Sequence, residues 1–358
     1  MLDDLKYIHE KDVQDALGVA EKQCQQLEYA FTIGADVVGR ADDGKLFGGI
    51  ELHNIVVAGM GGSALAAEIS KSWPGYDVPF EICRNYDIPR YVSKNTLFIA
   101  SSYSGNTEET LAALEQAEEK GANIAVIAAG GKLKAIAEEK KYPYLQLPGD
   151  FQPRYAVLYN LKALLTILAE AAILDGVTVD HLNDVVTKQA ADWLRSAAQS
   201  LRPDVPTKDN QAKQIAKELM GNSVVIYSGP KFYPAAYKWK INFNENAKNI
   251  AWCNQLPEFN HNEFLGWTSH PTTKPYKVVD IRSSLEHPRV LKRFEVTEKL
   301  LSGQRPSPDI IEPAGESLFL QLLWVIQLGD FVSLYLSLLN GLNPTPVDLI
   351  EKLKKELA

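Results

Sequence analysis

Residues 98–110 read Phe-Ile-Ala-Ser-Ser-Tyr-Ser-Gly-Asn-Thr-Glu-Glu-Thr, and they place a cluster of hydroxyls and a glycine where an apolar strand gives way to a helix. Residues 95–100 have the apolar character of a buried strand, and Leu111 and Leu114 give the next segment a helical apolar face. At such a junction, unpaired backbone N–H groups and the positive end of the helix dipole face the hydroxyls. The stretch therefore predicts an anion site, with a serine-rich turn that only caps its helix as the competing interpretation.

The side chains expected to line this site are those of Ser102, Ser104 and Thr107, because each hydroxyl can donate to an anion at a helix N-terminus. Asn106, with Glu109 three residues later, resembles a capping box at the start of the helix. Both features fit a phosphate group held by the first turn of that helix.

A second strand–turn–helix junction occurs earlier in the chain. Residues 54–70 read Asn-Ile-Val-Val-Ala-Gly-Met-Gly-Gly-Ser-Ala-Leu-Ala-Ala-Glu-Ile-Ser, again with an apolar strand before a polar turn. The carboxyl ends of neighbouring parallel strands meet at one crevice, which is where open α/β sheets bind ligands. We therefore expect the hydroxyl of Ser63 to join the first set.

The same segment also fits a dinucleotide-binding fingerprint. Gly59, Gly61 and Ala64 satisfy G-x-G-x-x-G/A, and Glu81 lies near the end of the next predicted strand, where a ribose-binding acid is expected. A nicotinamide-dependent dehydrogenase is therefore an alternative function. It leaves the hydroxyl cluster unexplained, because the pyrophosphate of a dinucleotide is held mainly by backbone groups.

The composition indicates a globular protein of about two domains: the chain has 358 residues, of which 46% are hydrophobic and 23% charged. The net charge of -8 argues against a nucleic-acid partner. The three cysteines, Cys24, Cys83 and Cys253, are too few and too scattered for a disulfide framework or a cysteine-rich metal site. The first residues do not resemble a signal peptide, and the apolar runs are expected to fall short of a membrane span. We therefore expect a cytoplasmic protein with no membrane partner.

The order of the predicted elements indicates an α/β fold with two tandem doubly wound parallel sheets. Strands are expected at residues 54–58, 78–82, 96–101, 123–128, 144–147, 223–228 and 276–281. Helices are expected over residues 4–37, 132–140, 155–174, 287–302, 315–340 and 343–357, among others. The expected organisation is a helical N-terminal segment over 1–38, a first α/β domain over 39–152, a helical connector over 153–220, a second α/β domain over 221–312 and C-terminal helices over 313–358.

Three side chains outside the two junctions are suited to chemistry. Glu245 lies among asparagines in a predicted helix, where it is either a partly desolvated general base or a solvated helix acid. His261, between two asparagines, is either structural or catalytic. Arg154 directly follows the first sheet, so its guanidinium either reaches the crevice or forms a surface ion pair.

Six motifs, in order along nearly the whole chain, together resemble the bifunctional phosphoglucose/phosphomannose isomerase family, which carries two sugar isomerase (SIS) domains in tandem. They are Gly59-Met-Gly-Gly-Ser63, Ser102-Tyr-Ser-Gly-Asn-Thr107, Pro153-Arg154, Asn244-Glu-Asn246, Phe259-Asn-His-Asn-Glu263 and Asn343-Pro-Thr-Pro-Val347. The second motif marks SIS domains generally. The Glu-Asn and Asn-His-Asn-Glu segments point to this particular family.

The resemblance implies an aldose–ketose isomerase that interconverts glucose 6-phosphate, and mannose 6-phosphate, with fructose 6-phosphate through a cis-enediol intermediate. Glu245 would move the proton between C1 and C2, Arg154 would stabilise the negative charge that develops there, and His261 would assist ring opening. The resemblance also implies a homodimer in which His261 reaches the site from the partner subunit. The implied phosphate cup consists of Ser63, Ser102, Ser104 and Thr107, and Gly61 and Gly62 are implied as further substrate-binding residues.

Two further site residues are implied near the C-terminus. Lys354 is the first choice for a lysine contributed by the last helix, with Lys352 as the alternative, and Thr345 is a polar residue near C1 or C2. No metal or other cofactor is expected, since an enediol route requires only a base, an acid and charge stabilisation. Besides the dehydrogenase, a non-catalytic SIS-type sensor of a sugar phosphate remains an alternative function. Because the second domain lacks the Ser-Gly-Asn-Thr turn, we expect it to serve catalysis and dimer contacts.

Overall fold

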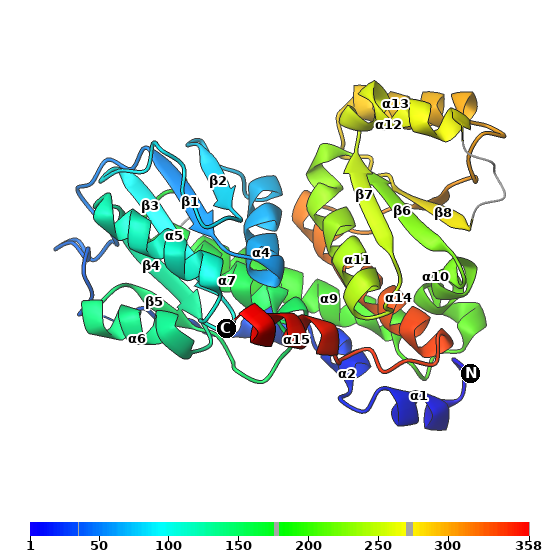
Figure 1. The fold of residues 1–358 in the computed structure, drawn as a ribbon, viewed down its shortest axis with the longest axis horizontal. Helices are drawn as coiled ribbons and strands as arrows, with labels where there is room; N and C mark the ends of the chain where they lie inside the picture. Colours follow the sequence, from blue (N-terminus) through cyan, green and yellow to red (C-terminus); the bar gives the residue numbers. More distant parts are fainter. Residues whose placement is uncertain (35, 175–178, 270–274, 358) are drawn as a thin grey trace. The chain divides into compact units, whose positions relative to one another are not determined.

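The computed structural model describes residues 1–34, 36–174, 179–269 and 275–357, and the chain forms two compact units (Figure 1). The first unit comprises Gln23–Asp192. The second unit combines Met1–Lys22 with Trp193–Ala358. The boundaries of the units differ from those of the expected segments. The N-terminal helices α1 and α2 belong to the second unit, and the expected connector is divided between the two units after Asp192.

The first unit is built on a five-stranded parallel sheet with the strand order β2-β1-β3-β4-β5. Its strands are β1 (Asn54–Ala58), β2 (Phe80–Cys83), β3 (Thr96–Ser102), β4 (Asn123–Ala128) and β5 (Tyr144–Gln146). Its α-helices are α3 (Cys24–Glu28), α4 (Gly61–Ser72), α5 (Glu108–Glu119), α6 (Gly131–Lys140), α7 (Val157–Glu170) and α8 (Val179–Leu182). A 3-10 turn, η1 (Pro153–Tyr155), leads into α7, and a π-helix, η2 (Asn183–Ala190), follows α8.

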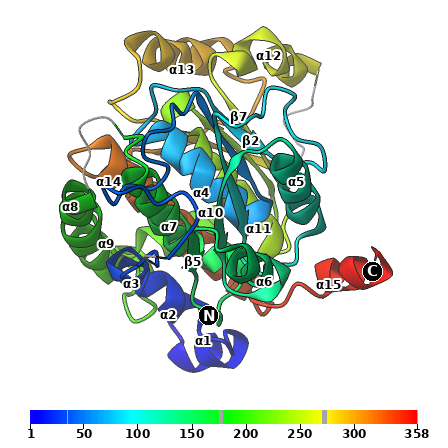
Figure 2. The ribbon, with the colours of Figure 1, turned by 90° about the vertical axis from the view of Figure 1, so that its left-hand side faces the viewer.

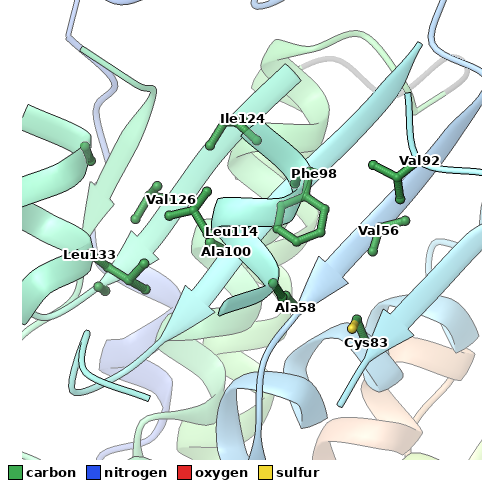
Figure 3. Close-up of a cluster of buried hydrophobic side chains, with 14 residues drawn as sticks. Val56, Ala58, Cys83, Val92, Phe98, Ala100, Leu114, Ile124, Val126 and Leu133 are labelled. Carbon is green, nitrogen blue, oxygen red and sulfur yellow. The ribbon is translucent and has the colours of Figure 1, made fainter. Parts of the chain in front are cut away.

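Helices cover both faces of this sheet, with α4 and α7 on one side and α5 and α6 on the other (Figure 2). Every residue of β3 is buried, as expected for a parallel strand covered on both faces. Figure 3 shows Phe98 and Val126 of the strands lying against Leu114 of α5 and Leu133 of α6. Burying one such side chain contributes about 1.5–3 kcal/mol. The expected doubly wound arrangement is confirmed for this unit.

The second unit has a four-stranded parallel sheet with the strand order β7-β6-β8-β9. Its strands are β6 (Ser223–Ser228), β7 (Ala251–Gln255), β8 (Tyr276–Ile281) and β9 (Asp309–Ile311). Its α-helices are α1 (Leu5–Lys11), α2 (Ala16–Glu21), α10 (Gln211–Leu219), α11 (Tyr233–Glu245), α12 (Glu263–Gly266), α13 (Pro288–Leu300), α14 (Leu318–Leu339) and α15 (Asp348–Leu357), while α9 (Ala191–Ala198) spans the boundary between the units. The 3-10 turns η5 (Pro230–Phe232) and η6 (Glu258–His261) follow β6 and β7.

The helix α14 corrects the expectation that no apolar run is long enough to cross a membrane. Its 22 residues are long enough and apolar enough to cross a membrane, but 89% of its most apolar stretch of 18 residues is buried inside the protein. It packs against α10 and α11 in the second unit. A helix that is apolar on all sides and buried in this way serves as a core helix of its unit.

One expected helix was wrong, and two strands were not predicted. In place of the single helix expected over residues 4–37, the described residues of this range form three short helices that end at Glu28, because Asp12 ends α1 and its carboxylate accepts the N–H groups of Ala16 and Leu17, both at 2.8 Å, at the start of α2. The strands β7 and β9 were missed. Each is short and mixes polar with apolar side chains, so neither has a run that predicts a strand.

Candidate functional site

The three hydroxyls predicted after β3 lie together in the first unit. Ser102 Oγ is 2.7 Å from Thr107 Oγ1 and 3.5 Å from Ser104 Oγ. The backbone N–H of Gly105 donates to Ser102 Oγ at 3.2 Å. Gly105 has φ +69°, and a Cβ there would lie 1.7 Å from the carbonyl oxygen of Gly130, so only glycine fits this turn.

Ser63 joins this cluster from the first turn of α4. It is buried, and its Oγ accepts the backbone N–H of Tyr103 at 3.2 Å. Gly61, the first residue of α4, has φ +50°. A Cβ on Gly62 would lie 2.6 Å from the carbonyl oxygen of Pro153, so glycine allows the turn after the first sheet to approach α4 closely.

The capping box expected at Asn106 is absent. The N-cap residue of α5 is Thr107, and no side chain caps the helix. The Oδ1 atom of Asn106 instead accepts the backbone N–H of Lys132 at 3.0 Å, which links this turn to α6. The first N–H groups of α5 therefore have no side-chain cap and can serve an anion in the cup formed by Ser63, Ser102, Ser104 and Thr107.

Arg154 belongs to the same unit as the cup. It lies in η1, which packs against α4, and only 2% of the residue is exposed, so the surface ion pair considered from the sequence is wrong. Its guanidinium lies 4.5 Å from the centre of the Tyr155 ring and donates to the Tyr155 hydroxyl at 3.3 Å and to Gln152 Oε1 at 3.5 Å. A fixed positive charge is thus held beside the helix that supplies Ser63.

Glu245 is the last residue of α11 in the second unit and is half-buried. One face of α11 carries three buried polar residues spaced four apart, which are Lys238, Asn242 and the C-cap residue Asn246. Lys238 and Asn242 both donate to a carboxylate oxygen of Asp330 in α14. This buried network fixes the end of α11 that carries Glu245.

Lys248 ties the end of α11 to the loop before α15. It has φ +49°, and its ammonium donates to the carbonyl oxygens of Asn246 at 3.3 Å, Asn343 at 3.1 Å and Pro344 at 3.1 Å. The N–H of Thr345 donates to Asn343 Oδ1 at 3.0 Å. The structure therefore brings the segments of Glu245 and Thr345 together. Lys248 was missed from the sequence, where its only signal is its position just after Asn-Glu-Asn.

The remaining predicted site residues also belong to the second unit. His261 ends η6 and is exposed. Lys352 and Lys354 lie on α15, and both are exposed. Lys354 forms an ion pair with Glu351 at 2.8 Å. All three side chains are therefore presented to solvent in the single chain.

The turns of the second sheet differ from those that form the cup. β6 and β8 are neighbours there, as β1 and β3 are in the first sheet. Glu286 follows β8, is 5% exposed, and accepts the backbone N–H of Lys231 in η5 at 3.0 Å. A Cβ on Gly229 would lie 2.3 Å from the Glu286 carboxyl group. The turn after β6 is therefore filled by one of the protein's own carboxylates.

The dinucleotide alternative rested on Glu81 as the ribose-binding acid. In the structure, a carboxylate oxygen of Glu81 accepts the hydroxyl of Tyr91 at 2.5 Å, so this acid already has a partner. Over the described part of the chain, no group of three or more His, Cys, Asp and Glu side chains is placed to hold a metal ion.

Comparisons with known proteins place the chain in the class of sugar-phosphate isomerases with two SIS domains. Residues 50–143 match the SIS domain model, and residues 208–357 match the model of the bacterial phospho-glucose isomerase C-terminal SIS domain. The chain is 33% identical over 341 residues to the bifunctional phosphoglucose/phosphomannose isomerase of Caldicellulosiruptor bescii, covering 93% of this chain and 96% of that relative. The chain belongs to the bifunctional phosphoglucose/phosphomannose isomerase family, and it is an isomerase.

Two further relatives extend the comparison. The bifunctional phosphoglucose/phosphomannose isomerase of Thermoplasma volcanium is 36% identical over 307 residues, covering 85% of this chain and 91% of that one. The D-glucosamine-6-phosphate 4-epimerase of Sulfolobus acidocaldarius is 36% identical over 220 residues, covering 61% of this chain and 65% of that one.

Solved structures share the fold at low sequence identity. The glucose-6-phosphate isomerase like protein from Thermus thermophilus has a TM-score of 0.64 at 15% identity, covering 99% of this chain and 98% of that one. The C-terminal domain of glucosamine-fructose-6-phosphate aminotransferase from Francisella tularensis has a TM-score of 0.67 at 16% identity, covering 96% of this chain and 97% of that one. These likenesses show a shared fold and nothing about activity.

Proposed function

We propose that this enzyme interconverts glucose 6-phosphate and mannose 6-phosphate with fructose 6-phosphate through a cis-enediol intermediate. The observation that carries the proposal is the cluster of Ser63, Ser102, Ser104 and Thr107 hydroxyls at the uncapped start of α5. Hydroxyls and helix N–H groups together suit the 6-phosphate of a hexose. Holding that end of the substrate leaves C1 and C2 free to meet a base.

Glu245 is the proposed base. In the direction from aldose to ketose, its carboxylate takes the proton from C2 while the C1 carbonyl oxygen gains a proton, which gives the enediol. Transfer of the proton to C1 and loss of the proton from the C2 hydroxyl then complete the ketose. Arg154 stabilises the oxyanion character that develops on the way, and its burial keeps its charge from being screened.

We further propose that His261 assists ring opening from the partner subunit of a homodimer. Its exposure at the end of η6 supports this role, because a side chain that serves a neighbouring subunit must project from its own. The isomerase is proposed to act in the cytoplasm, on sugar phosphates that enter and leave glycolysis and gluconeogenesis.

Lys354 is the proposed C-terminal lysine, with Lys352 as the alternative, and both lie on α15. The exposed apolar side chains of this helix are Leu349, Ile350, Leu353 and Leu357. Each lysine lies one turn after a side chain of this apolar stripe, Lys352 after Leu349 and Lys354 after Ile350.

A coupled assay with fructose 6-phosphate tests the function, because glucose and mannose 6-phosphate are followed separately. We expect the wild type to form both, and Glu245→Gln to lower turnover by ~10²- to 10⁴-fold while inorganic phosphate binding is retained. Glu295→Gln, which changes an exposed ion pair with Lys292, is the matched control and should be fully active.

The alternatives give different outcomes in the same experiments. Binding without turnover indicates the sensor, and unchanged turnover in Glu245→Gln removes the proposed base. Saturable binding in a fluorescence titration with NADH indicates the dehydrogenase. A product that is a 4-epimer instead of a ketose indicates the reaction named for the Sulfolobus relative.

A further inference from the structure

Tyr103 lies between two serines of the phosphate cup in the sequence, and its side chain is buried. It is 7% exposed. Its backbone N–H donates to Ser63 Oγ at 3.2 Å, and its carbonyl oxygen accepts the N–H of Ala129 at 2.9 Å. Its main chain therefore joins the turn after β3 to the turns after β1 and β4. These bonds do not depend on the nature of the side chain.

The hydroxyl of Tyr103 makes a separate connection. It donates to the carbonyl oxygen of Pro148 at 2.5 Å and accepts the N–H of Phe151 at 2.9 Å. Burial raises the pKa of Tyr103, so the hydroxyl stays protonated and can donate its hydrogen bond. Pro148 and Phe151 lie in the loop that leads from β5 into η1, three residues before Arg154 at its nearest point.

The loop that carries Arg154 is held from two sides. The guanidinium itself interacts with Gln152 and Tyr155, which are its near neighbours in sequence. The close approach of Pro153 to Gly62 fixes one side of the turn. The Tyr103 hydroxyl holds the other side, at the start of the loop, so it ties the segment before Arg154 to the cup.

We propose that Tyr103 is a positioning residue that sets the distance between Arg154 and the phosphate cup. This inference rests on the proposed function, because it assigns Arg154 to the end of the substrate opposite the phosphate. A substrate held by its phosphate meets a guanidinium at a fixed distance only if the loop cannot shift. A displacement of about 1 Å can lower a rate by about 10²-fold.

Tyr103→Phe tests the proposal because it removes the hydroxyl and keeps the ring and both backbone bonds. We expect kcat with fructose 6-phosphate to fall about tenfold, while KM and the inhibition constant of inorganic phosphate change by less than about twofold. Tyr142→Phe, which removes a hydroxyl that donates to Glu118 at 3.0 Å in the same unit, is the control and should match the wild type.

A double-mutant cycle separates positioning from a general structural role. In an Arg154→Ala background, Tyr103→Phe should cause no further loss of kcat, since its effect passes through the guanidinium. The same fold-loss in both backgrounds overturns the proposal. So does a Tyr103→Phe variant with wild-type kcat, or one whose phosphate inhibition constant rises as much as kcat falls.

A measurement that needs no turnover keeps this test distinct from that of the proposed function. Hydrogen exchange at the Phe151 amide should accelerate about tenfold in Tyr103→Phe, because its acceptor is gone, and should not change in Tyr142→Phe. An inactive wild type overturns the proposed function. Unchanged hydrogen exchange at the Phe151 amide overturns the proposed role of the Tyr103 hydroxyl.

Discussion

Lys238 and Asp330 form a buried ion pair between α11 and α14, two turns before Glu245. Their side chains are 1% and 2% exposed. Asn242, one turn after Lys238, donates to the same carboxylate oxygen. The end of α11 is thus fixed by charge-assisted hydrogen bonds inside the protein, and the proposed base stands on a rigid element.

Breaking this pair should cost stability. Lys238→Met and Asp330→Leu should each lower the free energy of unfolding by about 3–5 kcal/mol, because each leaves an uncompensated buried charge. The double variant should lose less than either single variant. Urea denaturation of the three proteins measures this, and equal or additive losses would show that the two charges are not coupled.

The cup should lose phosphate affinity when a hydroxyl is removed. Thr107→Val deletes the Oγ1 that lies 2.7 Å from Ser102 Oγ and should raise KM and the phosphate inhibition constant about tenfold. Thr110→Val is the control on the same helix, because Thr110 is buried and its Oγ1 has no hydrogen-bond partner. Inhibition by inorganic phosphate should be unchanged in the control. Equal constants in both variants would remove Thr107 from the cup.

Mixed dimers test whether His261 acts across a subunit interface. Glu245→Gln and His261→Asn should each be nearly inactive alone. Mixing equal amounts and allowing subunits to exchange should restore about a quarter of wild-type activity, because half of the dimers are mixed and each has one intact site. If His261 serves its own chain, both sites of a mixed dimer are defective and the mixture stays inactive.

Lys162 should make stability depend on pH. It is 3% exposed, its ammonium donates to Asn183 Oδ1 at 3.0 Å, and burial lowers the pKa of Lys162 to about 8 from 10.5. Between these pH values the unfolded chain binds the proton that the native protein releases, so this residue makes the free energy of unfolding rise with pH.

The comparison variant is Lys162→Met, which lacks the titrating group. Its free energy of unfolding should exceed that of the wild type most at pH 7.5, and the difference should shrink by about 1–3 kcal/mol by pH 10. Lys140→Met, at an ion pair with Glu118 on the surface, is the control. A difference between Lys162→Met and the wild type that is constant from pH 7.5 to 10 would contradict the lowered pKa.

The sequence predicted both sheets and the cup because these features are local. The apolar runs of β1, β3, β4, β6 and β8 and the hydroxyl turn after β3 are each encoded within a dozen residues. Two strands escaped prediction for the same reason, since β7 and β9 are extended only because a neighbouring strand pairs with them. The capping box failed because Asn106 found a partner in α6.

By itself, the sequence determined two doubly wound sheets, a turn with clustered hydroxyls after β3 and membership of an isomerase family, since strand periodicity and turn chemistry act between near neighbours. Tertiary structure alone decided that Arg154 is buried, that Glu286 packs into the turn after β6, and that Lys238 meets Asp330. The last two residues are 92 positions apart. Burial and charge pairing depend on which distant segments the fold packs together, and no local pattern encodes that.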